Sequence, residues 1–190
     1  GNIDNAFISI SAHKIGGVNG AGAISIPDFS KIAPTIFGGG HEKGIRSGTL
    51  NAAAISAFGL AAEIIEADKG SENRFNEFAK KIVNTIKEDK SLSHISLNGL
   101  PLENKHRVNY ILNLQIASSK SLDEIAYIFD SNKIAISFGS ACSAKVLGPS
   151  GVLLALGKNE EEAKKGLRVS FGYKTNANDI DAFLKLLKIV

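Results

Sequence analysis

The segment SAHK, residues 11–14, places a lysine directly after a predicted strand. Residues 6–10 are mostly apolar, and glycine is frequent in the stretch that follows the lysine, residues 15–22. Glycine allows the backbone to turn sharply or to approach another group closely. Lys14 is therefore expected at a strand end, on a tight turn, where an amine can lose its hydration and attack a carbonyl.

Two residues beside Lys14 could bind an anion. Ser11 offers a hydroxyl and His13 an imidazole, and both are suitable hydrogen-bond donors for a phosphate. A nucleophilic lysine next to phosphate donors indicates a Schiff base with a phosphorylated aldehyde, which points to pyridoxal phosphate. The alternative is a strand that ends in polar residues on a turn and has no chemical role.

A second polar segment, GGGHEKGIRSGTLN (residues 38–51), directly precedes a long helical pattern. Free backbone N–H groups at a helix start, together with Arg46 and the hydroxyls of Ser47 and Thr49, could bind an anion. The alternative is structural: Ser47 and Thr49 cap the helix, and Arg46 makes an ion pair. Taken alone, this segment favours the structural alternative.

The only cysteine, Cys142, lies among small residues between Gly139 and Gly148. A packing cysteine prefers apolar burial, whereas an exposed loop suits a reactive thiolate. We therefore interpret Cys142 as a functional thiol on a loop.

Arg168 stands inside an otherwise apolar predicted strand, in the segment LRVSFG (residues 167–172). An arginine at such a position is costly unless its charge is paired. Two interpretations stay open, a structural ion pair and a bidentate clamp on a substrate carboxylate.

Composition excludes several classes of protein. The 190 residues are 44% hydrophobic and 22% charged with a net charge of +3, which predicts a globular domain without a nucleic-acid surface. No apolar run is long enough for a bilayer span, and one cysteine fits a reducing compartment, so we expect a cytoplasmic protein that does not bind membranes. The histidines show no metal-ligand spacing with Cys142, so no metal site is predicted.

Hydrophobic spacing predicts two long helices that meet near Gly70. The first, from about Leu50 to Ile65, is alanine-rich and expected to be mostly buried. The second begins at Ser71 and carries a one-sided apolar stripe. The boundary between two domains is therefore predicted here, giving residues 1–69 and 70–190.

The second domain is predicted to mix strands and short helices, as a compact α+β domain does. Strands are expected over residues 94–99, 107–116, 133–138 and 167–172. Helices are expected over residues 121–129, 152–156, 160–165 and 180–187, with a capping box at Ser121 and Glu124 and a cap at Asn159.

Four of these segments, in this order, resemble the cysteine desulfurases, pyridoxal-phosphate enzymes related to the class V aminotransferases. The matching segments are SAHK (11–14), GGGHEKGIRSGTLN (38–51), GSACS (139–143) and LRVSFG (167–172). Each segment alone is a weak signal, but four in register are a strong one.

The resemblance implies a role for each matched residue. Lys14 would hold pyridoxal phosphate covalently and then move the α-proton of the substrate. Ser11 and His13 would bind the cofactor phosphate. Thr49 would reach the phosphate of the other subunit's cofactor across a homodimer interface, with Arg46 supporting its loop.

The resemblance also implies a sulfur transfer. Arg168 would bind the carboxylate of L-cysteine, and Cys142 would attack the sulfur of the substrate. The products would be L-alanine and a persulfide on Cys142, which a sulfur-acceptor protein would take for iron–sulfur or thio-cofactor assembly.

The fold expected from the resemblance is α/β, the C-terminal part of a fold-type I transferase dependent on pyridoxal phosphate. Residues 1–69 would be the C-terminal part of the large cofactor-binding domain, and residues 70–190 the small α+β domain. Family members are considerably longer, so the chain is expected to be the C-terminal half only.

Two other functions stay open at this point. One is a relative with the same fold, a class V aminotransferase or a selenocysteine lyase, although transamination needs no thiol at Cys142. The other is a catalytically silent fragment that serves dimerisation or contact with a sulfur acceptor.

Overall fold

The computed structural model describes residues 5–138 and 148–190. The chain divides into two compact units, Gly1–Lys69 and Gly70–Val190. No helix within the described ranges has the length and apolar content needed to cross a membrane.

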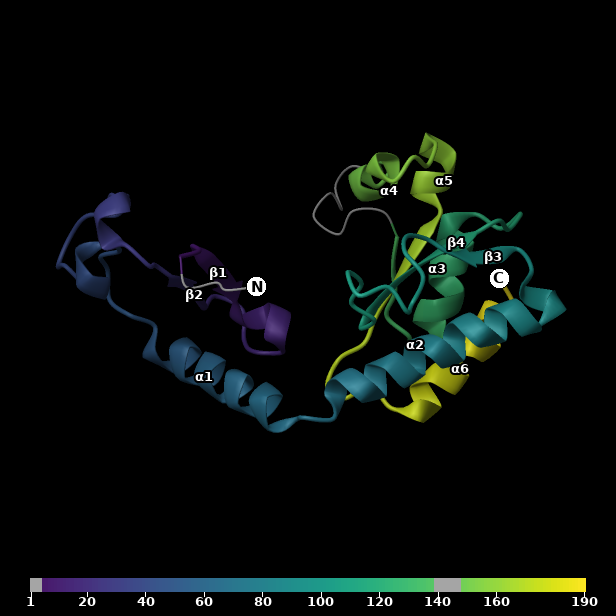
Figure 1. The fold of residues 1–190 in the computed structure, drawn as a ribbon, viewed down its shortest axis with the longest axis horizontal. Helices are drawn as coiled ribbons and strands as arrows, with labels where there is room; N and C mark the ends of the chain where they lie inside the picture. The colour runs from purple at the N-terminus through teal and green to yellow at the C-terminus, as the bar shows by residue number, and fades with distance from the viewer. Residues whose placement is uncertain (1–4, 139–147) are drawn as a thin grey trace. The chain divides into compact units, whose positions relative to one another are not determined.

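The first unit combines an antiparallel hairpin with one long helix (Figure 1). Strand β1 pairs with β2 so that Ile8 lies opposite Ser25 and Ser11 lies opposite Gly22. The elements along the described part of this unit are β1 (Ile8–Ser11), η1 (Ala12–Ile15), β2 (Gly22–Ser25), η2 (Phe29–Lys31), η3 (Glu42–Gly44) and α1 (Ala52–Ala67). Those named η are single turns of 3-10 helix.

Helix α1 forms where it was predicted, but the expectation that it is mostly buried is wrong. Within its span, the buried residues are Ala54 and Ala61, whereas Leu60 is 58% exposed and Ile64 44% exposed. The apolar residues of α1 lie on several sides of the helix, so their spacing predicts a helix but not which of its sides are covered. Within the described part of the unit, the hairpin and its turns cover only the stripe of small residues.

The second unit is built on a four-stranded antiparallel sheet in the order β3-β4-β6-β5. Its described elements are α2 (Ser71–Glu88), η4 (Lys90–Leu92), β3 (Ile95–Leu97), β4 (Ile111–Ile116), α3 (Leu122–Ser131), β5 (Ser137–Phe138), α4 (Gly151–Ala155), α5 (Glu160–Lys164), β6 (Gly166–Ser170) and α6 (Ala177–Leu187).

One face of this sheet carries the hydrophobic core. Leu112, Leu114 and Ile116 alternate along β4 and are almost completely buried, because successive side chains of a strand point to opposite faces. Helices α2 and α6, which lie side by side (Figure 1), and helix α3 supply the other half of the core. The rings of Phe129 on α3 and Phe183 on α6 lie 5.5 Å apart between their centroids.

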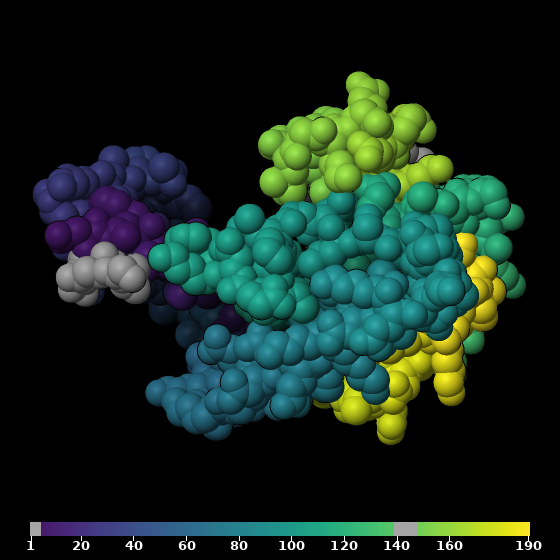
Figure 2. All heavy atoms as spheres, turned by 45° about the vertical axis from the view of Figure 1, so that its right-hand side comes forward, coloured from purple at the N-terminus to yellow at the C-terminus, as the bar shows by residue number. Residues whose placement is uncertain are grey.

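Local sequence signals fix the helix starts of this unit. Ser121 and Glu124 form the predicted capping box of α3, and Asn159 with Glu162 forms another at the start of α5. Helices α4 and α5 pack on each other and protrude from the unit, as Figures 1 and 2 show in yellow-green.

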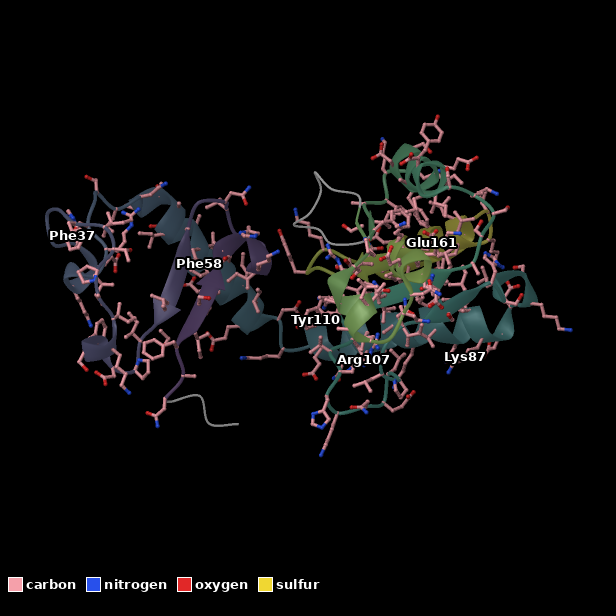
Figure 3. All side chains as sticks on the ribbon, turned by 90° about the horizontal axis from the view of Figure 1, so that it is seen from above. Phe37, Phe58, Lys87, Arg107, Tyr110 and Glu161 are labelled. Atoms are coloured by element: carbon pink, nitrogen blue, oxygen red, sulfur yellow. The ribbon has the colours of Figure 1, made fainter. Side chains whose placement is uncertain are left out.

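The strand predicted over residues 107–116 is shorter than expected. Strand β4 begins at Ile111, and Val108 and Tyr110 are about half exposed. The reason is Arg107, which lies in the connection between β3 and β4 (Figure 3) and donates through Nη1 to the carbonyl of Leu100. A turn bond from the Arg107 N–H to the Asn104 carbonyl, 3.0 Å, keeps this segment out of the sheet.

Two aromatic residues on α3 test the location of the core. Phe129 is fully buried, whereas Tyr127 is 72% exposed. We expect Phe129→Ala to lower the free energy of unfolding of this unit by about 3–5 kcal/mol. Tyr127→Ala should change it by less than about 0.5 kcal/mol. Urea unfolding followed by far-UV circular dichroism measures both, and equal losses would contradict the assigned core.

The carboxylate of Asp89 predicts an acid dependence of stability. It lies 2.6 Å from Lys188 Nζ and accepts hydrogen bonds from the Ser91 N–H and hydroxyl. These contacts, with Lys188 first, lower the pKa of Asp89 from 3.8 to about 2. A lowered pKa stabilises the fold above the unfolded value, and that contribution is lost as pH falls through the folded one.

We therefore expect Asp89→Asn to destabilise the chain at neutral pH and to differ less and less from the wild type between pH 4 and pH 2. Unfolding midpoints measured across that range check the trend. Lys188→Gln should show the same convergence, and a pH-independent difference would contradict the role of this pair.

Candidate functional site

Ser11, His13 and Lys14 share one turn at the end of β1. The 3-10 turn η1 follows the strand directly and ends at Gly16, whose φ of 80° is left-handed. All three predicted site side chains are exposed, whereas Ala12 between them is completely buried. The structure therefore presents a hydroxyl, an imidazole and an amine together on a turn anchored by the intervening alanine.

Close packing against α1 fixes this turn. The Gly17 N–H donates to the Ala12 carbonyl at 2.9 Å, and the Ala12 N–H donates to the Ala21 carbonyl at 3.0 Å. A Cβ at Gly17 would lie 3.0 Å from the Ala12 carbonyl oxygen and 3.3 Å from the Cβ of Ala61. Small residues thus bring the turn that bears Lys14 into direct contact with α1.

In the second predicted segment, residues 38–51, the expectation that Ser47 caps α1 is wrong. Its hydroxyl is buried and accepts a hydrogen bond from the Gly40 N–H at 3.3 Å, so it braces the glycine-rich loop and does not cap α1. Asn51 is the cap, since its side chain accepts from the Ala54 N–H at 3.1 Å. Thr49 is exposed and does not cap α1, so its predicted contact with a phosphate stays a prediction.

Backbone strain is concentrated in this same segment. Glu42 and Lys43 have φ values of 52° and 57°, which cost energy for residues with a Cβ and are often retained at functional sites. Arg46 donates through Nη1 to the Ser47 carbonyl at 3.0 Å, and a Cβ at Gly48 would lie 3.0 Å from that nitrogen. Arg46 therefore braces the backbone just before Thr49.

Arg168 lies on β6 in the second unit, in the middle of a row that crosses three strands. It is directly opposite Asn113 of β4 on one side and Ser137 of β5 on the other. Residues opposite each other in an antiparallel sheet share a face, and Leu112 and Leu114 occupy the other one. Arg168 therefore points away from the hydrophobic core.

Arg168 is half-buried and has no acidic partner within the described part of the chain. The structural ion pair that the sequence left open is thus not present among these residues. A half-buried cation without an acid is a suitable group for an incoming carboxylate.

Residues that the sequence did not single out surround Arg168. Asn98, Asn113 and Gln115 form a hydrogen-bonded cluster of amides on the same face. Leu153 of α4 covers Gly166, where a Cβ would lie only 2.4 Å from the leucine Cδ1. The polar alternation of Asn113 and Gln115 between leucines was the available signal, but their shared partner Asn98 lies fifteen or more positions away.

Cys142 lies outside the described residues. On the N-terminal side, Phe138 of β5 is opposite Leu167 of β6. On the C-terminal side, the Ser150 N–H donates to the Ala163 carbonyl of α5 at 3.2 Å. No group of three or more histidine, cysteine, aspartate or glutamate side chains with a metal-binding arrangement occurs in residues 5–138 and 148–190.

The predicted site residues therefore fall into separate groups. Ser11, His13 and Lys14 lie together on one turn of the first unit, and Thr49 lies on another loop of that unit. Arg168 belongs to the second unit.

Comparison with known proteins gives one consistent family. The family model described as "Aminotransferase class-V" matches residues 2–183. The chain is 36% identical over 183 residues to cysteine desulfurase IscS 1 of Archaeoglobus fulgidus, covering 95% of this chain and 46% of that protein.

Two solved structures extend the likeness. The NifS-like protein from Rickettsia africae is 30% identical, with a TM-score of 0.78 over 96% of this chain and 46% of that chain. SspA in complex with cysteine is 29% identical, with a TM-score of 0.59 over 87% of this chain and 43% of that chain. The predicted fold class, part of the α/β fold-type I of enzymes dependent on pyridoxal phosphate, is confirmed.

The chain spans about half the length of the curated relatives and solved structures that it matches. This share agrees with the expected match to part of a cysteine desulfurase.

Gly17 tests whether α1 holds the turn that bears Lys14. We expect Gly17→Val to weaken the contact by about 1–3 kcal/mol, because backbone and Ala61 occupy the space of the new side chain. The Ala12 amide hydrogen should then exchange with solvent about tenfold faster. Gly59→Ala is the matched control, since nothing lies within 4 Å of a Cβ at that position of α1. Unchanged exchange in Gly17→Val would show that the contact does not hold the turn.

Proposed function

The chain belongs to the class-V aminotransferase family, and we propose that it is part of a cysteine desulfurase that uses pyridoxal phosphate. The observation that carries the proposal is the turn η1, on which Lys14, Ser11 and His13 are exposed together. Similarity to proteins named cysteine desulfurase supports the choice of reaction within the family.

The residues of this turn fit pyridoxal phosphate chemically. An exposed primary amine can hold the aldehyde carbon, and a hydroxyl and an imidazole beside it can donate to the phosphate. Lys14 would hold the cofactor covalently, with Ser11 and His13 at its phosphate. When bound, pyridoxal phosphate supplies an electron sink that stabilises negative charge at the α-carbon of an amino acid.

The amine of Lys14, once free, would move the proton of the substrate α-carbon. The turn that carries Lys14 is held to α1 through Ala12 and Gly17, and this limits the positions that the Lys14 amine can reach. General acid–base catalysis depends on such positioning.

Arg168 would orient L-cysteine through its carboxylate. A guanidinium that faces away from the core and has no acid among the described residues can bind a carboxylate through two parallel hydrogen bonds. The positive charge also selects an α-amino acid over an amine that lacks the carboxylate.

Cys142 would accept the sulfur. Its thiolate attacks the substrate sulfur, so an S–S bond forms while the bond between the substrate Cβ and its sulfur breaks. The electron pair left on carbon takes up a proton, and the products are L-alanine and a persulfide on Cys142. A sulfur-acceptor protein would then remove the terminal sulfur.

The exposed apolar side chains of residues 1–69 support their assignment to a larger cofactor-binding domain. Phe37 is 80% exposed (Figure 3), and Leu60 and Ile24 are more than half exposed. Large apolar side chains exposed to this extent are expected where another part of a protein covers them. We assign residues 70–190 to the small domain, and we propose a homodimer in which Thr49 reaches the other subunit's cofactor phosphate.

A class-V aminotransferase or a selenocysteine lyase relative is the second candidate, because the family model that matches is described by aminotransferases and not by sulfur transfer. A catalytically silent fragment is the third. The proposed reaction differs from transamination in requiring a thiol, and it predicts a cytoplasmic protein, where the thiol stays reduced.

The test uses the native polypeptide that carries this sequence, with pyridoxal phosphate and L-cysteine. Borohydride should fix one cofactor to the peptide that contains Lys14, and mass spectrometry detects it. Lys14→Ala should lose the label and lower alanine formation by at least about a hundredfold. Lys80→Ala, at an exposed position on α2, is the control and should keep both.

Cys142→Ala separates the candidates. Under the proposal it abolishes the protein-bound persulfide and the alanine that accompanies it. Unchanged alanine and sulfide release would refute sulfur transfer to Cys142. Formation of a keto acid in place of alanine would favour the aminotransferase.

A further inference from the structure

Three amide side chains meet beside Arg168, on the polar face of the sheet. Asn98 follows β3 and is 5% exposed, Gln115 on β4 is 9% exposed, and Asn113 between them in space is half-buried. Buried amides are retained where their hydrogen bonds fix one arrangement. In this cluster the direction of the hydrogen bonds is defined, because one amide donates to the other two.

Asn98 donates hydrogen bonds to the side-chain oxygens of both Asn113 and Gln115. Its Nδ2 donates to Asn113 Oδ1 at 2.8 Å and to Gln115 Oε1 at 3.4 Å. An amide has one acceptor, its oxygen, and one NH₂ group that can only donate. The Nδ2 of Asn113 is therefore left without a bond to Asn98, and among the described residues it has no other acceptor.

The backbone holds Asn98 in place. Its N–H donates to the Asn113 carbonyl at 2.8 Å, and its own carbonyl accepts from Arg107 Nη1 at 3.4 Å. Arg107 is fixed in turn by a bond from Nε to Asn109 Oδ1, 3.2 Å, and Asn109 Nδ2 donates to Asn76 on α2 at 2.9 Å. The orientation of the amides is thus tied to the core helix α2.

Asn113 and Arg168 are neighbours on the polar face, and within the described residues neither the Asn113 NH₂ group nor the Arg168 guanidinium has an acidic partner. The two residues are directly opposite each other on β4 and β6, where Cβ atoms are separated by about 5 Å. Leu153, which covers Gly166, provides an apolar wall beside them. Asn113 Nδ2 and the Arg168 guanidinium are both hydrogen-bond donors on this part of the face, and two such donors suit an anion.

We infer that Asn113 Nδ2 and the Arg168 guanidinium bind the same carboxylate, that of an α-amino acid, and that Asn98 is the positioning residue that turns Asn113 toward it. The inference rests on the proposed function for the role of Arg168 and adds a second carboxylate ligand with its orienting partner. Both added residues lie in the second unit, as Arg168 does.

Two isosteric substitutions test it. In Asn98→Asp the new carboxylate accepts from Asn113 Nδ2, which reverses that amide and presents its oxygen to the ligand. In Asn113→Asp the bond from Asn98 Nδ2 is kept, but an acceptor replaces the free donor. The control Asn104→Asp adds the same charge to the same connection and keeps the bond from the His106 N–H, 2.9 Å.

The probe is L-alanine, with L-alaninamide as the analogue that lacks the carboxylate, titrated into the ¹⁵N-labelled 190-residue chain. L-alanine should shift the side-chain amide signal of Asn113, and L-alaninamide should not. Asn98→Asp, Asn113→Asp and Arg168→Gln should each weaken L-alanine binding by about tenfold or more, as expected for a lost bond to a charged group. Asn104→Asp should bind as the wild type does.

The outcomes distinguish this inference from the proposed function. If Arg168→Gln weakens binding and the two asparagine variants do not, the inference fails and the role of Arg168 stands. If Arg168→Gln has no effect, both fail. Absence of any L-alanine binding by the folded wild-type chain also overturns the inference. Should Asn98→Asp unfold, Asn113→Asp still decides, because it retains the bond to Asn98.

Discussion

The period of two along β4 and β6 decides what each face of the small sheet can do. Leu112 and Leu114 must face the helices, because burial of these side chains stabilises the unit. The residues between them must then face the other way, and they are Asn113 and Gln115. On β6 the same register sends Leu167 to the core and Arg168 to the polar face. A slip of one residue would bury a guanidinium, so core packing itself holds Arg168 in its place.

The first unit depends on a different constraint: the residues between the turn η1 and helix α1 must have small side chains or none. Ala12, Gly17 and Ala61 are small enough for the turn η1 to touch α1, and even a Cβ at Gly17 would lie 3.0 Å from the Ala12 carbonyl oxygen. The turn positions Lys14 through this contact, since the hairpin beside it is exposed on both faces. Such a unit buries little apolar area of its own, so its stability must come largely from surfaces that cover α1 and the hairpin.

Local signals made the helices and most strands of the second unit predictable. Ser121 and Glu124 are three positions apart, and their capping box needs nothing beyond that spacing. The predictions failed where a distant residue decides the outcome. Arg107 bonds to the Leu100 carbonyl instead of extending the predicted strand. The hydroxyl of Ser47 accepts a bond from the Gly40 N–H instead of capping α1. The burial expected for α1 failed for a related reason, because periodicity reveals an apolar surface but not what lies against it.

The site shows the same division between local and distant information. Ser11, His13 and Lys14 are neighbours in sequence, so their shared turn could be read from one short segment. Asn98, Asn113 and Arg168 come from three separate strand regions, and only the register of the sheet brings them together. The residue types around Arg168 were enough to make it a candidate, because a charged residue in an apolar strand is unusual. Asn98 gave no such signal, since an asparagine before a glycine is ordinary in a turn. Its role follows from which atom it donates to, because one hydrogen-bond donor shared by two amide oxygens is enough to turn a neutral amide toward an anion.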